Sequence, residues 1–176
     1  MLLVRPRLME AVMSIAESFL PEFDMEMANT RKVLERVPED KFGWKPHEKS
    51  GTMGWLADHC AFLPGWCKET FTLTELDLSP DGRTFVPDPS PATSKALLEK
   101  FDRCVTAGRA ALAAASDEAM MVSWSLLMTW KPILPPMPRI AVYRSMIMNH
   151  LVHHRAQLVV YLRLNDVPVP GLYGPS

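Results

Sequence analysis

Three of the chain's five histidines fall within five positions of one another, in the stretch NHLVHHRAQLVVYLR at residues 149–163. Each residue of an α-helix turns about 100°, so His150 and His154 lie roughly 40° apart on one face, one turn from each other. These two can share a ligand, whereas His153 lies on the flank of that face. Two imidazoles on an apolar face are costly unless each ring finds a hydrogen bond or a metal ion. A pair alone is more typical of hydrogen-bonded core histidines.

A third histidine changes this interpretation. His59 lies on the same helical stripe as Trp55 and Trp66, so its side chain is also expected to point inward. Metal sites are commonly built between facing helices of a bundle. Three neutral imidazoles that leave a fourth position to water or substrate are typical of a catalytic zinc site, whereas closed structural sites usually use cysteines. We therefore predict a metal site at His59, His150 and His154.

The residues around these histidines suggest no catalytic group. Leu151 stands where the H-E-x-x-H motif of metallopeptidases needs its general-base glutamate, so a peptidase is disfavoured. Asp58 is expected on the solvated side of its helix, and Arg155 in a surface or inter-helix salt bridge. Tyr161 is the third acid–base candidate that lies near by sequence, and His47 in the loop KPHEKSG is expected to be solvated. The catalytic and cofactor-binding residues therefore stay unassigned.

Composition limits the class of protein. The 19 basic and 20 acidic residues nearly cancel to a net charge of −1, and no basic cluster suggests nucleic-acid binding. The three cysteines, Cys60, Cys67 and Cys104, have no recognisable pairing distance, so we expect thiols in a reducing, cytoplasmic compartment. Cys60 and Cys67 are interpreted as small core residues. The apolar N-terminus is interrupted by charges such as Arg5 and Glu10, so neither a signal peptide nor a membrane span is expected.

Helical periodicity dominates the chain, and strand-like alternation is scarce. It predicts four long helices, at about residues 8–37, 50–71, 93–115 and 139–165. The first is expected to bend or to start near Pro21, and Pro64-Gly65 is expected to kink the second. Residues 72–92 are predicted to form a surface loop, and residues 123–138 a short strand or hairpin or an irregular insert. The economical fold is all-α, a four-helix bundle formed by one domain at residues 1–176.

Both ends of the sequence resemble one known family. The segment at residues 149–176 closely resembles the C-terminal motif of the DinB family of DinB/YfiT-like metalloenzymes, and residues 24–66 look like the family's first two helices. The middle of the chain fits only in length and pattern. Ala156 departs from the commonest form of the motif, in which glycine often follows the arginine, and the proline-rich insert KPILPPMP departs as well. Neither departure removes a ligand, although the insert could reshape the mouth of the site.

The resemblance implies more than the helical pattern does. It implies an up-down-down-up bundle, a homodimer and a divalent transition metal, most often nickel or zinc. The ligands would be one histidine of the second helix and two of the fourth, which by position are His59, His150 and His154. Helical geometry selects the same three residues independently.

An open site of three imidazoles can acidify a bound water or thiol and polarise an electrophile. Several relatives in the family are thiol S-transferases or isomerases, so the resemblance suggests an S-transferase-like enzyme. A low-molecular-weight thiol would attack a small electrophilic substrate. A stress-associated metal-binding protein without turnover and a metal-assisted hydrolase are the alternatives, and the hydrolase lacks an evident general base. A pocket lined by Trp55, Trp66, Tyr143 and Tyr161 would favour the enzyme.

Overall fold

A computed structural model describes residues 13–84 and 89–175 of the chain. Residues 8–12 of the first predicted helix lie outside the described residues. The helices are α1 (Ile15–Leu34), α2 (Met53–Phe62), α3 (Trp66–Thr72), α4 (Ser94–Ala113), α5 (Asp117–Met121), α6 (Arg139–Val142) and α7 (His150–Arg163). The strands are β1 (Glu75–Asp77), β2 (Ser123–Met128), β3 (Lys131–Pro132) and β4 (Met137–Pro138).

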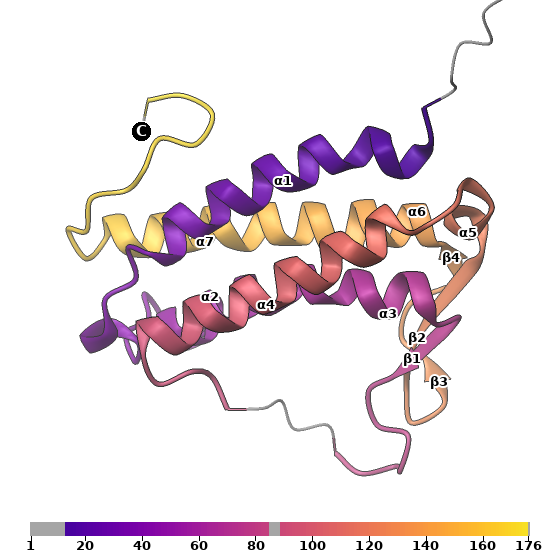
Figure 1. The fold of residues 1–176 in the computed structure, drawn as a ribbon. Coiled ribbons are helices and arrows are strands. Elements are labelled where there is room, and N and C mark those ends of the chain that lie inside the picture. The colour runs from indigo at the N-terminus through magenta and orange to yellow at the C-terminus, as the bar shows by residue number, and fades with distance from the viewer. Residues whose placement is uncertain (1–12, 85–88, 176) are drawn as a thin grey trace, which may run out of the picture.

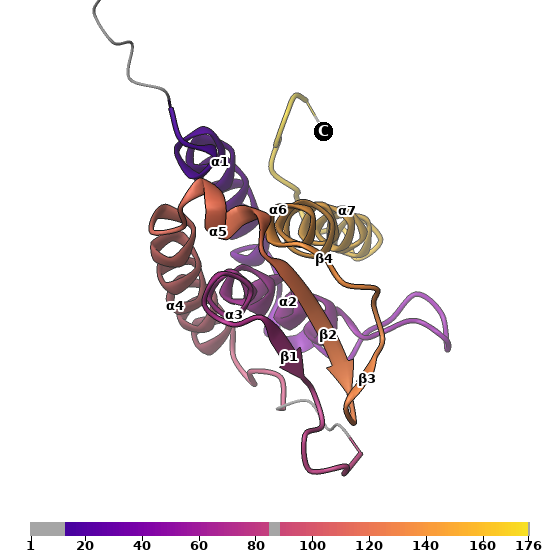
Figure 2. The ribbon, with the colours of Figure 1, turned by 90° about the vertical axis from the view of Figure 1, so that its right-hand side faces the viewer.

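Four long helical segments lie side by side around the core (Figures 1 and 2): α1, α2 with α3, α4, and α6 with α7. α1 packs on α4, α4 packs on α2 and α3, and α7 closes the circuit by packing on both α2 and α1. Phe23 of α1, Phe101 of α4 and Leu158 of α7 are fully buried between them. The apolar face of each helix, spaced at three and four residues, drives this packing.

α1 begins at Ile15, before Pro21, so of the two alternatives predicted at Pro21, a bend or a start, the start is wrong. Ser14 accepts a hydrogen bond from the Glu17 backbone N–H, and the Glu17 carboxylate accepts one from the Ser14 N–H. This capping box satisfies two backbone donors that a helix terminus would otherwise leave free. Pro21 therefore lies inside the helix, where its missing N–H leaves the Glu17 carbonyl without its usual donor.

The helix predicted at residues 50–71 is interrupted at Pro64-Gly65, where a kink was predicted. A single 3₁₀ turn, Leu63–Gly65, separates α2 from α3. α4 passes very close to this turn, because a Cβ atom at Gly108 would lie 2.1 Å from the Pro64 carbonyl oxygen. Any larger residue at this position of α4 would push the two helical segments apart.

A small mixed sheet corrects the all-α prediction, although the chain is mostly helical as predicted. β2 pairs in parallel with β1 and antiparallel with β3 and β4, at one end of the helices. The hairpin allowed for residues 123–138 is thus confirmed, whereas β1 lies in the segment predicted to be only a loop. Leu76 of β1 packs against a second apolar cluster, which contains Trp124 of β2 and Val142 of α6. β1, β2 and α6 therefore contribute side chains to this cluster together.

The last helical segment is interrupted where the sequence predicted one continuous α-helix. Residues Tyr143–Asn149 between α6 and α7 are π-helical. In a π-helix, successive side chains are rotated about the helix axis by a smaller angle than in an α-helix. The segment ends directly before His150, one of the three predicted metal ligands.

Candidate metal centre

Three histidine side chains meet between α2 and α7. The Nε2 atoms of His59 and His150 lie 3.2 Å apart, and one ring nitrogen from each of His59, His150 and His154 lies within 4.8 Å of the other two. Their ring centroids are separated by 4.6 to 4.9 Å. Within the described ranges this is the one group of three or more histidine, cysteine or acidic side chains with a spacing suited to a metal ion.

Protein hydrogen bonds hold one nitrogen of each α7 histidine. The Nδ1 atom of His150 donates to the Met146 carbonyl oxygen at 3.2 Å, and the Nδ1 atom of His154 bonds to Gln157 Oε1 at 2.7 Å. Since a carbonyl oxygen can only accept, Nδ1 carries the proton and Nε2 keeps a free lone pair. Such partners fix both the tautomer and the orientation of metal-binding imidazoles.

The π-helical segment makes the first of these bonds available. In a regular α-helix the Met146 carbonyl would accept from the His150 backbone N–H. Here that N–H bonds to Ile147 instead, so the ring of His150 can reach the Met146 carbonyl. Breaks of this type are frequent at functional sites in helices.

The histidines are half-buried, and their surroundings favour neutral rings. Burial lowers the pKa of His59 to about 4, helped by the nearby His154 and His150. Burial and the neighbouring His154 also lower the pKa of His150. Deprotonated imidazole is the form that binds metals, so at neutral pH these two rings lose no proton when an ion binds.

The spacing fits a metal ion. Zinc–nitrogen bonds of about 2.0–2.1 Å in a tetrahedral site place neighbouring donor atoms about 3.4 Å apart. His59 Nε2 and His150 Nε2 lie 3.2 Å apart, close to that value. The donor set has three imidazoles and no carboxylate or thiolate, and imidazole suits zinc, nickel and copper ions.

Aromatic side chains shape the entrance to the histidines. The Trp55 indole stacks on His59 with ring centroids 5.1 Å apart and planes within 10°, and its edge approaches His154. Trp55 is nevertheless 45% exposed. A Cβ atom at Gly51 would lie 2.5 Å from the Trp55 ring, so only glycine there lets the indole take this position. Phe62 also contacts His59 in an edge-to-face arrangement.

The other sequence candidates lie apart from the cluster. His153 is exposed on the flank of α7, and His47 is exposed in its loop, as predicted. Asp58 is buried and pairs with Lys100, so the prediction that it is solvated is wrong. Arg155 is buried in an inter-helix ion pair with Glu26.

The predicted aromatic pocket is only partly present. Trp55 borders the histidines, and the Tyr161 hydroxyl donates to the Gly51 carbonyl beneath it. Tyr143 is instead fully buried against Phe19 and Phe71, because the π-helical turns rotate it away from the direction that α-helical geometry predicts. Trp66 lies further along, against Phe62.

Sequence reasoning missed the roles of Gln157, Met146 and Phe62. Gln157 lies three residues after His154, a spacing that places two side chains side by side on a helix, so this signal was present. The Met146 carbonyl gave no signal, because its availability depends on the π-helical turn.

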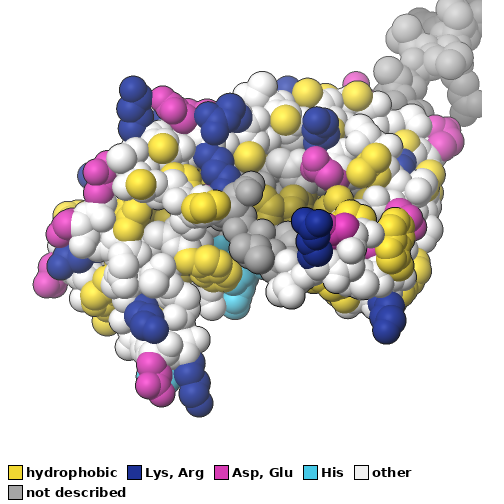
Figure 3. Space-filling view, turned by 90° about the horizontal axis from the view of Figure 1, so that it is seen from below, with side chains coloured by type: hydrophobic (Ala, Val, Ile, Leu, Met, Phe, Trp, Pro, Cys, Tyr) yellow, Lys and Arg dark blue, Asp and Glu magenta, His cyan; other side chains and the backbone are white. Residues whose placement is uncertain are grey.

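Seen from below, histidine side chains are visible at the surface next to hydrophobic side chains (Figure 3). No helix among the described residues is long and apolar enough to cross a membrane.

Comparison with known proteins adds a family. The chain is similar to the crystal structure of a DinB-like protein from Bacillus cereus ATCC 10987, with 24% identity over 93% of this chain and 100% of that one and a TM-score of 0.69. It is also similar to the DinB-like protein YjoA from Bacillus subtilis, with 17% identity, coverage of 90% and 99%, and a TM-score of 0.66. At these identities the likeness concerns the fold alone.

No curated protein matches the sequence. The sequence model of the DinB superfamily matches residues 22–158, which include most of the chain and all three clustered histidines. The DinB-like fold and this match agree with the resemblance seen at the two ends of the sequence. The chain therefore belongs to the DinB superfamily.

Proposed function

We propose that the protein binds a divalent transition-metal ion, nickel or zinc, through His59, His150 and His154, and that it transfers a low-molecular-weight thiol to a small electrophile. The observation that carries the proposal is the convergence of three ring nitrogens within 4.8 Å of one another. A core role for these rings would need no such convergence, since one hydrogen bond per histidine would satisfy each of them.

Three histidine ligands leave coordination positions free for exogenous groups. An ion bound there would lower the pKa of a coordinated thiol or water and polarise an electrophile. The protein's own residues hold and shield this position. Gln157 and the Met146 carbonyl orient the α7 rings, and Trp55 covers one side while it stays open to solvent on another.

The cysteines of this chain support an external thiol. Cys60 and Cys67 are fully buried, and burial raises the pKa of Cys60 to about 12 and that of Cys67 still further. The thiolate is the nucleophilic form of cysteine, so neither residue can supply it at neutral pH. Burial also raises the pKa of Cys104. A thiol transfer at this site would therefore use a thiol from solution.

Metal-assisted hydrolysis has less support. It needs a general base near the attacking water. The group of side chains that could hold the ion contains no aspartate or glutamate, and Asp58, the acid next to His59 in sequence, is paired with Lys100.

Elemental analysis of protein purified without a nickel column tests the metal site. Calorimetric titration of the metal-loaded protein with cysteine, glutathione and 2-mercaptoethanol then tests the thiol. Stoichiometric metal and a thiol that binds only to the metal-loaded form would support the proposal. Metal without thiol affinity would leave a metal-binding protein, and absence of metal would refute the site.

A further inference from the structure

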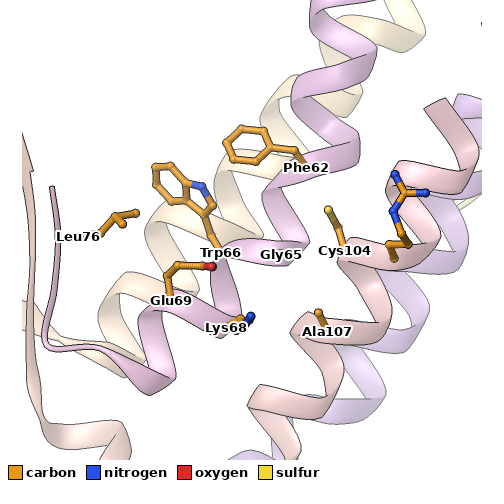
Figure 4. A pocket seen from close by; sticks show the side chains of 9 residues that line it. Phe62, Gly65, Trp66, Lys68, Glu69, Leu76, Cys104 and Ala107 are labelled. Atoms are coloured by element: carbon orange, nitrogen blue, oxygen red, sulfur yellow. The ribbon is translucent and has the colours of Figure 1, made fainter. Parts of the chain in front are cut away.

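A pocket of about 430 Å³, wide open to solvent, lies between α3 and α4, one side chain away from the histidines. Its volume falls in the range of small-molecule sites, about 300–1,000 Å³. Phe62 and Trp66 form one wall, Leu76 of β1 extends that wall, and Cys104 lies on the opposite side (Figure 4). The function proposed above makes no use of this cavity.

Small residues keep the cavity open. Gly65 belongs to the turn between α2 and α3, and a Cβ atom there would already lie 3.3 Å from Cys104 Sγ. Ala107 lines the cavity one turn further along α4. The close crossing of the turn by α4 therefore leaves space beside it that neither helix fills.

An aromatic wall joins the cavity to the candidate metal centre. Phe62 contacts His59 with ring centroids 5.4 Å apart, and it contacts Trp66 at 5.6 Å. Both rings are only half-buried although they belong to the apolar stripe of α2 and α3. Half-exposed aromatic rings that line a concave site are typical contacts for a flat apolar ligand.

Unpaired cations stand at the edge of the cavity. Lys68 and Arg103 line it, and neither side chain makes a hydrogen bond or an ion pair with any residue that the structure describes. Lys100, one turn before Arg103 on α4, is neutralised by Asp58. Glu69 is the acidic residue of the lining, so the lining carries one more positive than negative charge while the whole chain is negative. An anionic group would therefore find a partner at this edge.

We propose that this pocket binds an organic anion with a flat, aromatic or otherwise apolar body. Its body would rest on Trp66 and Leu76, and its charge would pair with Arg103 or Lys68. Binding of the anion rests on the cavity alone.

Cys104 offers a reporter inside the cavity. It is half-buried, whereas Cys60 and Cys67 are buried, so N-ethylmaleimide should modify Cys104 first in the native protein. Peptide mass spectrometry follows the modification rate with and without 2-naphthoate. At about ten times its Kd, 2-naphthoate should slow modification about tenfold, because only unoccupied protein reacts. The uncharged 2-naphthamide serves as the control ligand.

Matched variants locate the binding. Arg103→Gln should weaken 2-naphthoate binding about tenfold and leave 2-naphthamide unchanged, since it removes a charge-assisted contact worth about 1.4 kcal/mol. Lys95→Gln, which removes an exposed cation from the same helix, should change neither. Ala107→Leu should exclude both ligands, whereas Ala110→Leu, on the exposed face of α4, should exclude neither. Each comparison uses the ratio of rates with and without ligand in one variant, so that altered Cys104 reactivity cancels.

The same measurement in His154→Ala protein separates this inference from the proposed function. Protection by 2-naphthoate should persist there, because His154 does not line the cavity. If the unchanged protein binds no metal and 2-naphthoate still protects its Cys104, the proposed function fails and the anion site stands. Metal and thiol binding without protection of Cys104, or protection that survives Ala107→Leu, would overturn the anion site and leave the proposed function standing.

Discussion

Each α7 histidine uses one nitrogen for the protein and keeps the other free. His150 donates to a backbone carbonyl and His154 bonds to Gln157, each through Nδ1, so the fold leaves the Nε2 atom of each ring available. Two ring nitrogens that both carry lone pairs repel each other at 3.2 Å unless a proton or a cation lies between them. Either a proton on His59 Nε2 or a bound metal ion satisfies this pair, and the third ring, His154, is the reason to expect an ion.

Replacing the histidines one at a time should distinguish the metal ligands from the neighbouring His153. His59→Ala and His154→Ala should each weaken metal binding more than about 100-fold, since even changes behind the ligands cost about 10–100-fold. His153→Ala, exposed on the flank of the same helix, should keep its metal. Metal content after dialysis, with competition against a chelator, measures the effect. Loss of metal in His153→Ala but not in His150→Ala would show that the wrong face of α7 has been assigned.

Acid should destabilise the metal-free protein in a defined window. The pKa of His59 is about 4 in the folded chain, below its ordinary value of 6.5, so the unfolded chain takes up the proton first. The stability that the neutral ring contributes is therefore fully present above about pH 6.5. It falls as the pH drops and is lost below about pH 4.

Urea unfolding at pH 7 and at pH 4.5 measures this loss. His59→Asn removes the titrating group, so its free energy of unfolding should decrease less between the two pH values than that of the unchanged protein. Equal decreases would mean that His59 is not kept neutral by burial.

At the scale of elements, the turn between β2 and β3 has an unfavourable backbone conformation and is held by hydrogen bonds to β1. Thr129 and Trp130 form a two-residue loop with φ of 52° and 63°, the left-handed region that favours glycine or asparagine. The Asp77 carboxylate of β1 accepts the backbone N–H groups of Thr129 at 3.0 Å and Trp130 at 2.6 Å. The parallel pairing of β1 and β2 thus holds a turn that its own residues disfavour.

Trp130→Gly should stabilise the protein by about 0.5–1 kcal/mol, because it relieves the left-handed backbone of a residue whose side chain is 64% exposed. Lys131→Gly, at the next position in β3, should destabilise it, since glycine weakens an ordinary strand. Thermal unfolding of the two variants checks the prediction. A stabilised Lys131→Gly would show that flexibility, and not the sign of φ, decides the effect.

At the scale of the whole molecule, a buried ion pair joins three distant parts of the chain. Arg155 of α7 is 1% exposed and lies 2.6 Å from the Glu26 carboxylate of α1. The Tyr173 hydroxyl of the C-terminal tail donates to the same carboxylate, and Thr30 accepts from Arg155. With every member bonded, the network fixes how α1, α7 and the tail meet.

Arg155→Met should cost about 3–5 kcal/mol of unfolding free energy, because it leaves the Glu26 carboxylate buried without a cation. The double variant Arg155→Met, Glu26→Leu should recover much of that loss. Arg163→Met, exposed near the end of the same helix, should stay within about 0.5 kcal/mol of the unchanged protein. Chemical denaturation of the four proteins measures these differences, and a double variant no more stable than Arg155→Met would refute the burial argument.

The homodimer implied by the family stays a prediction.

The sequence by itself determined the helical segments and the three histidines. Apolar residues that recur every three or four positions show which face of a helix packs on the core, and this pattern located α1, α2, α4 and α7. His150 and His154 lie within regular α-helix, where the angle per residue is fixed, and their pairing therefore follows from spacing alone.

Only the tertiary structure decided the remainder. The π-helical turns at Tyr143–Asn149 depend on packing, so they buried Tyr143 and opened the Met146 carbonyl to His150 without a signal in the sequence. β1 has three residues, too few for alternation to show, and it forms because β2 supplies its hydrogen bonds. Asp58 is buried because α4 brings Lys100 to it. Contacts between segments distant in sequence determine each of these features, and no local pattern encodes such contacts.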